Sequence, residues 1–158
     1  MKFQPDTPEG VNVITRQEPG RIWVGTQPVS HSVLVPWVGE VLAWDAPSFE
    51  ALTPAHFGRI AALRPEVVIF GSGQRLRFPA PALLRALIEA GIGIETMDTA
   101  AACRTYNVLV SEQRSVVAAL VLAPGPLQTT MQTTQQTTQQ TTQQTPQHTA
   151  FAGPRIAG

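Results

Sequence analysis

Two short stretches of the chain carry residue types that could bind a ligand. The first is Gly71-Ser72-Gly73, which comes directly after a run of β-branched residues and is followed by Arg75 and Arg77. Glycines let backbone N–H groups approach an anion, and arginine donates paired hydrogen bonds to a carboxylate or a phosphate. The second stretch begins at Asp98-Thr99, where a helix start is expected. Side by side, the two stretches would form a small-anion pocket.

The Gly71–Gly73 stretch is not a specific phosphate motif. A dinucleotide fingerprint needs a third glycine that runs into a helix, and a P-loop needs Gly-Lys-Ser or Gly-Lys-Thr; the chain has neither after this strand. A second interpretation therefore stays open. In it the glycines form a tight turn, and Arg75 and Arg77 pair with Glu95 or Asp98.

Cys103 is the only cysteine, which excludes an intrachain disulfide and a zinc site built from several cysteines. It lies inside the predicted third helix, one turn after Thr99 and one turn before Asn107. A reactive thiolate needs a helix N-terminus, a cation or a histidine to lower its pKa. Cys103 is too far into the helix for the N-terminus to lower the pKa of its thiol, and the nearby cation of Arg104 projects in another direction. The residue is thus either a small buried apolar side chain or a reactive thiol.

Polar and aromatic side chains elsewhere suggest further roles. Asn107 is polar for a helix interior, so we expect it to hold the backbone of the Gly71–Gly73 loop, with ligand contact as the alternative. Trp37 and Trp44 mark either a partner surface or packing against the N-terminal hairpin. The three histidines are widely separated and form no metal-binding pattern. We therefore predict no catalytic residues, no metal and no cofactor.

The elements that position these residues follow from hydrophobic periodicity. Residues 11–17 and 21–26 alternate apolar and polar side chains around Pro19-Gly20, which predicts a β-hairpin. Continuous or alternating apolar runs predict further strands at 32–36, 38–44, 66–70, 92–97 and 115–122.

Three helices are expected between these strands. The first begins at Thr53-Pro54 and ends before Pro65. The second follows Pro79 and Pro81, and Gly91 ends it. Its apolar face comprises Leu83, Leu84, Leu87 and Ile88. Asp98 or Thr99 is expected to cap the third helix, which runs to about Val110 or Ser111.

The alternation of strands and helices after residue 65 predicts a layered α/β domain with a mostly parallel central sheet. Helices pack on this sheet, and the N-terminal third adds a β-hairpin or a small second sheet. Loops at the carboxyl ends of parallel strands meet at one edge. We therefore expect a crevice between the Gly71–Gly73 loop and the helix start at Asp98.

Residues 1–127 hold the apolar content of one domain, and residues 128–158 begin with a long tract of glutamine and threonine. Without apolar surface this tail is expected to be disordered. The formal net charge is zero, which argues against nucleic-acid binding. The chain has no secretory leader pattern and no apolar run of about 18 residues, so we expect a cytoplasmic protein without membrane insertion.

Several of these stretches together resemble a known family. The similarity spans residues 11–122 and depends on Gly71-Ser72-Gly73, Gly91-Ile92-Gly93-Ile94-Glu95, Asp98-Thr99, Ala102-Cys103 and Thr105-Tyr106-Asn107-Val108-Leu109. Arg114 and Val117–Leu120 continue it. This combination resembles the adipogenesis-associated Mth-like domain family, which includes mitochondrial complex I assembly factor three and uncharacterised bacterial proteins.

The resemblance implies a layered α/β fold and a protein-binding, assembly-factor-like role without an established reaction. Our first hypothesis is therefore a non-catalytic interaction module with a protein partner. The alternative is a small-anion-binding protein or an enzyme that uses the crevice beside Asp98. Its ligand-binding residues would be Gly71, Ser72, Gly73, Arg75, Arg77, Thr99 and Asn107.

Overall fold

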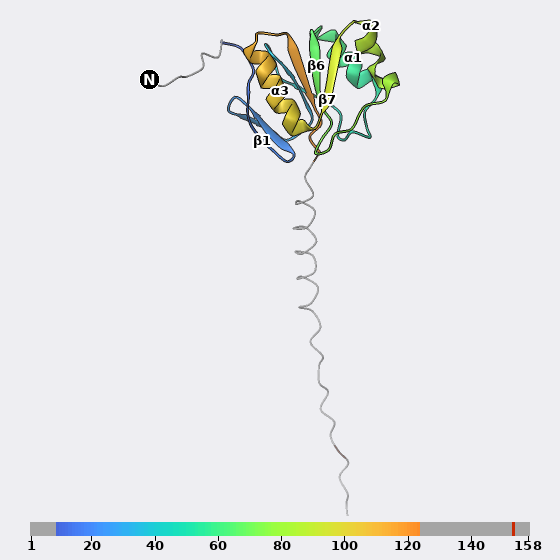
Figure 1. The fold of residues 1–158 in the computed structure, drawn as a ribbon. Coiled ribbons are helices and arrows are strands. Elements are labelled where there is room, and N and C mark those ends of the chain that lie inside the picture. The colour runs from blue at the N-terminus through green and yellow to red at the C-terminus, as the bar shows by residue number, and fades with distance from the viewer. Residues whose placement is uncertain (1–8, 124–152, 154–158) are drawn as a thin grey trace, which may run out of the picture. The chain divides into compact units, whose positions relative to one another are not determined.

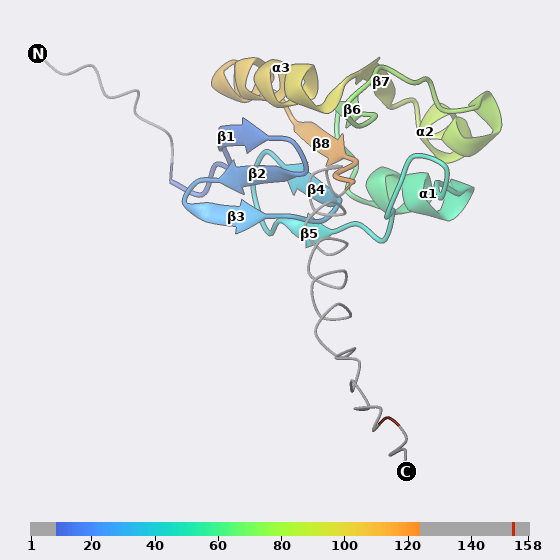
Figure 2. The same cartoon turned by 90° about the horizontal axis from the view of Figure 1, so that it is seen from below.

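Two β-sheets of different size organise the chain (Figures 1 and 2). The computed structural model describes residues 9–123 and 153. The larger sheet has the strand order β5-β4-β8-β6-β7. Its strands are β4 (Val33–Pro36), β5 (Leu42–Ala43), β6 (Val67–Gly71), β7 (Gly93–Met97) and β8 (Val116–Leu120). The predicted boundary near residue 127 and the Gln/Thr-rich tract lie outside the described residues.

The smaller sheet is antiparallel and confirms the predicted N-terminal hairpin. It consists of β1 (Ile14–Glu18), β2 (Arg21–Val24) and β3 (Gln27–Val29). Pro19 and Gly20 form the turn between the first two strands, and Gly20 has a positive φ of 74°. The third strand was not expected, because three residues that include a proline give almost no strand signal.

The prediction of a mostly parallel central sheet is wrong, because this sheet is mixed. β6 pairs in parallel with both β7 and β8, as expected for strands joined by helical crossovers. β4, however, runs antiparallel to β8 and to β5. The short connection 37–41 between β4 and β5 cannot span the crossover that a parallel pair requires, so these two strands pair as neighbours in a hairpin.

Helices cover both faces of the central sheet (Figure 2). They are α1 (Pro54–Ala62), α2 (Arg85–Glu89), which a 3-10 turn at Pro81–Leu84 precedes, and α3 (Thr99–Ser111). α1 and α2 lie on one face, while α3 and the small sheet lie on the other. Since strand side chains alternate, Ile69 of β6 packs on the α3 side and Phe70 on the α1 side.

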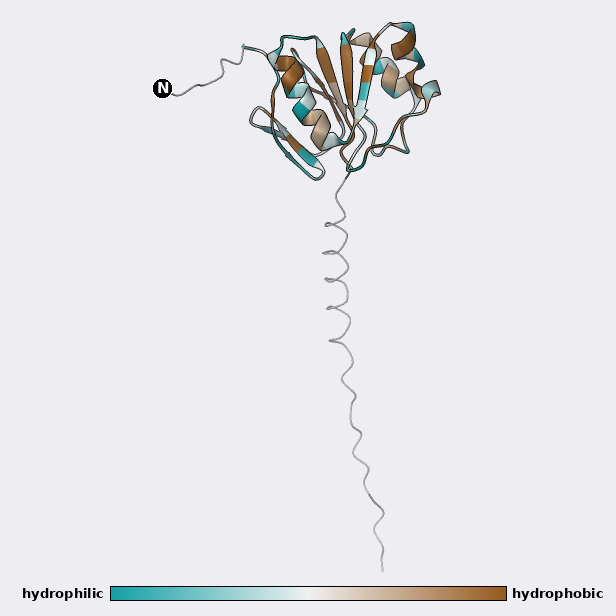
Figure 3. Ribbon diagram, viewed as in Figure 1, coloured by the Kyte–Doolittle hydropathy of each residue, from teal (hydrophilic) through white to brown (hydrophobic). Residues whose placement is uncertain are grey.

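The central strands are the most apolar part of the fold (Figure 3). All five residues of β8 are buried, because layers cover it on both faces. The second predicted helix is shorter than expected and its apolar face is incomplete, since Ile88 is 64% exposed. Gly91 ends it as predicted, with a φ of 67°.

Trp44 belongs to the core and does not mark a partner surface. It is 2% exposed and packs edge-on against Phe57 and Phe70. Its indole Nε1 donates a hydrogen bond to the carbonyl of His56 at 3.2 Å. Trp37 is half-buried beside the core on the α3 side. The sequence placed both tryptophans near β4 but could not decide which face of the sheet each one covers.

Candidate functional site

The carboxyl ends of β6 and β7 meet at one edge of the central sheet, as predicted. β6 leads into Gly71-Ser72-Gly73, and β7 leads through Asp98 into α3. The backbone N–H of Ser72 donates to the carbonyl of Met97 at 2.9 Å, which fixes the first loop beside the end of β7. Two stretches separated by about 25 residues in the sequence therefore lie side by side.

Thr99 closes the space between the two stretches. Its hydroxyl accepts a hydrogen bond from the N–H of Gly73 at 3.0 Å and donates one to the carbonyl of Val121 at 3.1 Å. The N–H of Thr99 also donates to the carbonyl of Gly73 at 2.8 Å. The loop and the helix start thus bond directly to each other at Gly73 and Thr99.

Gly71 and Gly73 are required for this close approach. A Cβ atom on residue 71 would lie 2.9 Å from Cδ2 of Leu120 and 3.0 Å from the Cα of Thr99. Gly73 has a φ of 107°, which side chains other than hydrogen rarely allow. The two glycines therefore serve the packing of the loop against α3.

The hydroxyl of Ser72 is also used inside the loop. It lies 2.7 Å from the carbonyl of Arg75 and 3.1 Å from that of Met97, and it accepts a hydrogen bond from the N–H of Arg77 at 2.9 Å. Ser72 is fully buried. Its contacts with the following residues hold the loop in one conformation.

The two arginines of the loop differ. Arg77 is half-buried, and its guanidinium pairs with Glu50 and stacks on the ring of Phe49 at 4.4 Å. The predicted pairing of Arg77 with Glu95 or Asp98 is wrong. Its partner Glu50 comes from the segment before α1, and no local sequence pattern places that segment beside the loop. Arg75 is exposed and forms no ion pair with any residue that the structure describes.

Asp98 caps α3. Its carboxylate accepts a hydrogen bond from the N–H of Ala101 at 2.8 Å, which satisfies one of the free donors at the helix start. This capping role was one of the two alternatives that the sequence offered for the first turn of α3, and Thr99 becomes the first helical residue.

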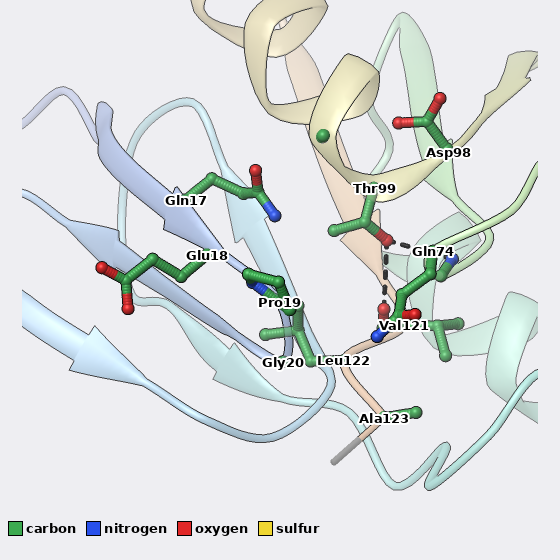
Figure 4. A pocket seen from close by; sticks show the side chains of 12 residues that line it. Gln17, Glu18, Pro19, Gly20, Gln74, Asp98, Thr99, Val121, Leu122 and Ala123 are labelled. Carbon is green, nitrogen blue, oxygen red and sulfur yellow. Dashed lines mark hydrogen bonds between the residues drawn. The ribbon is translucent and has the colours of Figure 1, made fainter. Parts of the chain in front are cut away.

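A shallow depression of about 370 Å³ lies beside Thr99 (Figure 4). The β1–β2 turn, the start of α3 and the chain after β8 surround it, with the lining residues Gln17, Glu18, Gln74, Asp98, Thr99 and Leu122 among others. The lining includes two carboxylates, Glu18 and Asp98, and no lysine or arginine. The two carboxylates point away from the depression and bond to Arg16 and to the N–H of Ala101, respectively. Both arginines of the loop lie outside the lining, so no cationic side chain that could pair with an anion lines it.

Asn107 connects α3 to the small sheet. Its side-chain oxygen accepts a hydrogen bond from the N–H of Ile14 at 3.0 Å, and its amide nitrogen donates to the carbonyl of Ile14 at 2.7 Å. The expected clamp on the Gly71–Gly73 loop is therefore wrong. The reason is that α3 runs away from this loop after its first turn, so that Asn107 lies opposite β1.

Tyr106 extends the same connection. Its hydroxyl lies 3.0 Å from the carbonyl of Asn12 and 3.1 Å from that of Pro36. It therefore joins α3 both to the segment before β1 and to the end of β4. Tyr106 and Asn107 together hold the small sheet against the α3 side of the central sheet.

Cys103 is buried in the core beneath α3. Burial raises the pKa of its thiol to about 12, although Arg104 acts in the opposite direction. The thiol is consequently protonated near neutral pH, a state in which cysteine is a poor nucleophile. In the part of the chain that the structure describes, no group of three or more metal-ligating side chains could hold a metal ion.

Two exposed apolar side chains in the same loop were not predicted from the sequence. Leu76 is 52% and Phe78 is 72% exposed. They alternate with Arg75 and Arg77, and a period-two alternation of large apolar and basic residues outside any predicted strand is the signal that could have indicated them.

Comparisons with known proteins define the family. A family model described as "Protein of unknown function (DUF498/DUF598)" matches residues 14–121. The chain belongs to this family. It is also 31% identical over 125 residues to the bovine "NADH dehydrogenase [ubiquinone] 1 alpha subcomplex assembly factor 3", covering 78% of this chain and 67% of the relative. The chain thus spans about two thirds of the length of the curated relatives that it matches.

Solved structures of the same type confirm the Mth-like fold. A Bordetella pertussis protein described as a Mth938-like domain has a TM-score of 0.71 and 29% identity, covering 82% of this chain and 98% of its own. A Bordetella parapertussis protein has a TM-score of 0.68 and 36% identity, covering 72% of this chain and 97% of its own. Among the described residues, no helix has both the length and the apolar character needed to cross a bilayer.

Proposed function

We propose that this family member is a non-catalytic interaction module that acts in the cytoplasm and assists the assembly of a multi-subunit complex. The main support is the use of the polar groups at the strand ends. The Thr99 hydroxyl, the Ser72 hydroxyl and the Asp98 carboxylate each bond to the protein's own backbone. A catalytic or ligand-binding role would require such groups to be free for a substrate.

Similarity to assembly factors supports the same proposal. The bovine and mouse relatives are both named as assembly factors of NADH dehydrogenase, and each is 31% identical to this chain. Assembly factors act by binding folding or partly assembled subunits. By analogy, the partner of this protein is a subunit or another assembly factor of a membrane-bound respiratory complex.

Affinity capture in the native host tests the proposal. The full chain would carry a small tag at its own locus, and cells would be cross-linked briefly with formaldehyde before capture and quantitative mass spectrometry. The expected result is one reproducible set of enriched proteins that also co-migrates with the chain in a density gradient. The control is an unrelated protein of similar size with the same tag. Equal recovery with the control in every growth state would contradict the proposal.

A further inference from the structure

The loop after β6 exposes an unusual combination of side chains. We call residues Gln74–Phe78 the 74–78 loop; it leads from β6 toward α2 (Figure 1). Leu76 and Phe78 are the two large apolar side chains on it, and both are more than half exposed. Two large apolar side chains exposed within three residues of one loop, rather than scattered singly, suggest a surface used for contact.

The loop is held in a fixed conformation. Ser72 bonds to the backbone of Arg75 at one end and of Arg77 toward the other. Arg77 then reaches back to stack on Phe49 and to pair with Glu50. Leu76 and Phe78 therefore flank a side chain that is anchored to the body of the protein. Such an arrangement lowers the conformational entropy that binding would cost, because the backbone that carries the exposed side chains is already held in place.

The charge beside these apolar side chains is positive. Glu50 is paired with Arg77, and Asp98, which lines the same depression as Gln74, bonds to the N–H of Ala101. Arg75 has no such partner among the described residues. The 74–78 loop thus offers two apolar side chains next to one uncompensated cation, to which an apolar segment with a carboxylate is complementary.

A second copy of the chain and an anionic bilayer are less suitable binding partners for this loop. A two-fold contact between copies of the chain would bring the two Arg75 side chains together, and like charges repel. An anionic bilayer would be attracted by this one arginine only weakly, because stable membrane binding takes several basic residues or a second anchor. A rigid, singly charged apolar loop matches the hot spot of a protein interface instead.

We propose that the 74–78 loop is the docking surface for the partner, and that it binds a short segment in which apolar residues are flanked by aspartate or glutamate. This inference rests on the proposed function and names the surface and the chemistry of its partner. Leu76 and Phe78 enter apolar contacts, and Arg75 pairs with the carboxylate. Arg77 is a positioning residue that keeps the loop in place.

A displayed library of random twelve-residue peptides, panned against the full chain, is the probe. The selected peptides are expected to combine apolar residues with neighbouring carboxylates. Fluorescence anisotropy should then give a Kd that rises about tenfold or more for Phe78→Ala, as expected for a hot-spot side chain. Arg75→Glu should weaken the binding of these peptides and should strengthen the binding of versions in which lysine replaces the acidic residue.

Matched controls are available on the opposite face of the central sheet. Val108 and Arg104 are exposed on α3, so Val108→Ala and Arg104→Glu remove the same kinds of group away from the loop. Both variants should bind the selected peptides as the unaltered chain does. Circular dichroism verifies that all variants keep the fold, which is expected because the altered side chains are exposed.

Four results would overturn the proposal. One is a set of selected peptides without acidic residues, and the second is equal binding of the peptides by Phe78→Ala and the unaltered chain. The third is sedimentation with vesicles of 70% phosphatidylcholine and 30% phosphatidylglycerol that depends on Phe78. The fourth is a dimer in analytical ultracentrifugation that Phe78→Ala dissociates. If affinity capture recovers a partner equally with Phe78→Ala, the proposed function stands and only this surface fails.

Discussion

The hydroxyl of Thr99 lies 3.0 Å from the backbone nitrogen of Gly73 and accepts its hydrogen bond. This contact joins the first turn of α3 to the loop after β6, and the same hydroxyl donates to Val121 after β8. Three chain segments that follow three parallel strands are therefore fixed by one side chain. At the edge of the sheet where many α/β proteins bind ligands, the hydroxyl of Thr99 is therefore used by the fold itself.

Replacing Thr99 by valine should destabilise the protein by about 1–3 kcal/mol, because the buried N–H of Gly73 and the carbonyl of Val121 lose their partner. Because valine has nearly the same shape as threonine, the loss of stability measures the contribution of the hydroxyl's hydrogen bonds. Urea denaturation measures it. Thr99→Ser keeps the hydroxyl and should cost less than Thr99→Val; an equal cost would contradict the hydrogen-bonding role.

Gly71→Ala should cost about 1–3 kcal/mol of folding stability, since the added methyl group would meet Leu120 and Thr99 at about 3 Å. Gly58→Ala is the matched control. Gly58 lies inside α1 with nothing within 4 Å of the added atom, and the change should stabilise the protein by about 0.5–1 kcal/mol. Thermal or urea unfolding should show that the free energy of unfolding falls in Gly71→Ala and rises in Gly58→Ala.

Asn107→Ala should loosen the small sheet and not the Gly71–Gly73 loop. The substitution removes both hydrogen bonds to Ile14, which leaves its N–H and carbonyl unpaired. Amide hydrogen exchange followed by NMR should speed up at Ile14 and its neighbours in β1, while the amide of Gly73 stays protected. Faster exchange at Gly73 alone would mean that Asn107 acts on the loop.

Alkaline pH should reduce stability through two buried groups in α3. Burial raises the pKa of Cys103 from 9.0 to about 12 and also raises that of Tyr106. Above about pH 9 the unfolded chain loses the thiol proton while the folded chain keeps it, so the free energy of unfolding falls as the pH rises toward about 12. Below about pH 9 this contribution of the thiol is fully present.

Urea denaturation at several pH values between about 8 and about 10 measures this decline. Cys103→Ala removes the thiol and should make the fall in stability over this range shallower than in the unaltered chain. The exposed change Arg104→Ala serves as the control and should preserve most of the slope. A steep slope that Cys103→Ala leaves unchanged would assign the effect to other groups.

Inorganic phosphate should not stabilise the protein in a thermal-shift measurement at constant ionic strength. The N–H of Gly73 and the hydroxyl of Thr99 already bond to each other, and the depression beside them is lined by no lysine or arginine. A bound anion present at 100 times its Kd would add about 2.7 kcal/mol. A rise in Tm that Arg75→Ala together with Arg77→Ala abolishes would restore the anion-binding alternative.

Local signals were enough to locate most of the elements. Thr53-Pro54 predicted the start of α1, Asp98 predicted the cap of α3, and Pro19-Gly20 predicted the first turn, because each depends on backbone chemistry within a few residues. The meeting of Gly73 and Thr99 was also predictable, since parallel strands joined by crossovers bring their carboxyl ends to one edge.

The roles of the candidate residues were harder to predict from the sequence. Asn107 and Arg77 bond to Ile14 and Glu50, which lie 93 and 27 residues away in the sequence. The antiparallel position of β4 beside β8 is equally remote from any local pattern. Such pairings depend on which strands and loops are neighbours in space, and a single sequence without its fold carries no direct record of them.

The sequence by itself therefore determined the order of most strands and helices, several of the caps and turns between them, and the family to which the chain belongs. The elements, caps and turns follow from side-chain periodicity and from backbone conformations that only certain residues allow, whereas the family follows from the resemblance of several motifs. Only the tertiary structure decided whether the loop edge was open, which faces became the core, and which side chains remained exposed. Those outcomes depend on ångström-scale contacts between distant segments, such as the one that lets Thr99 close upon Gly73.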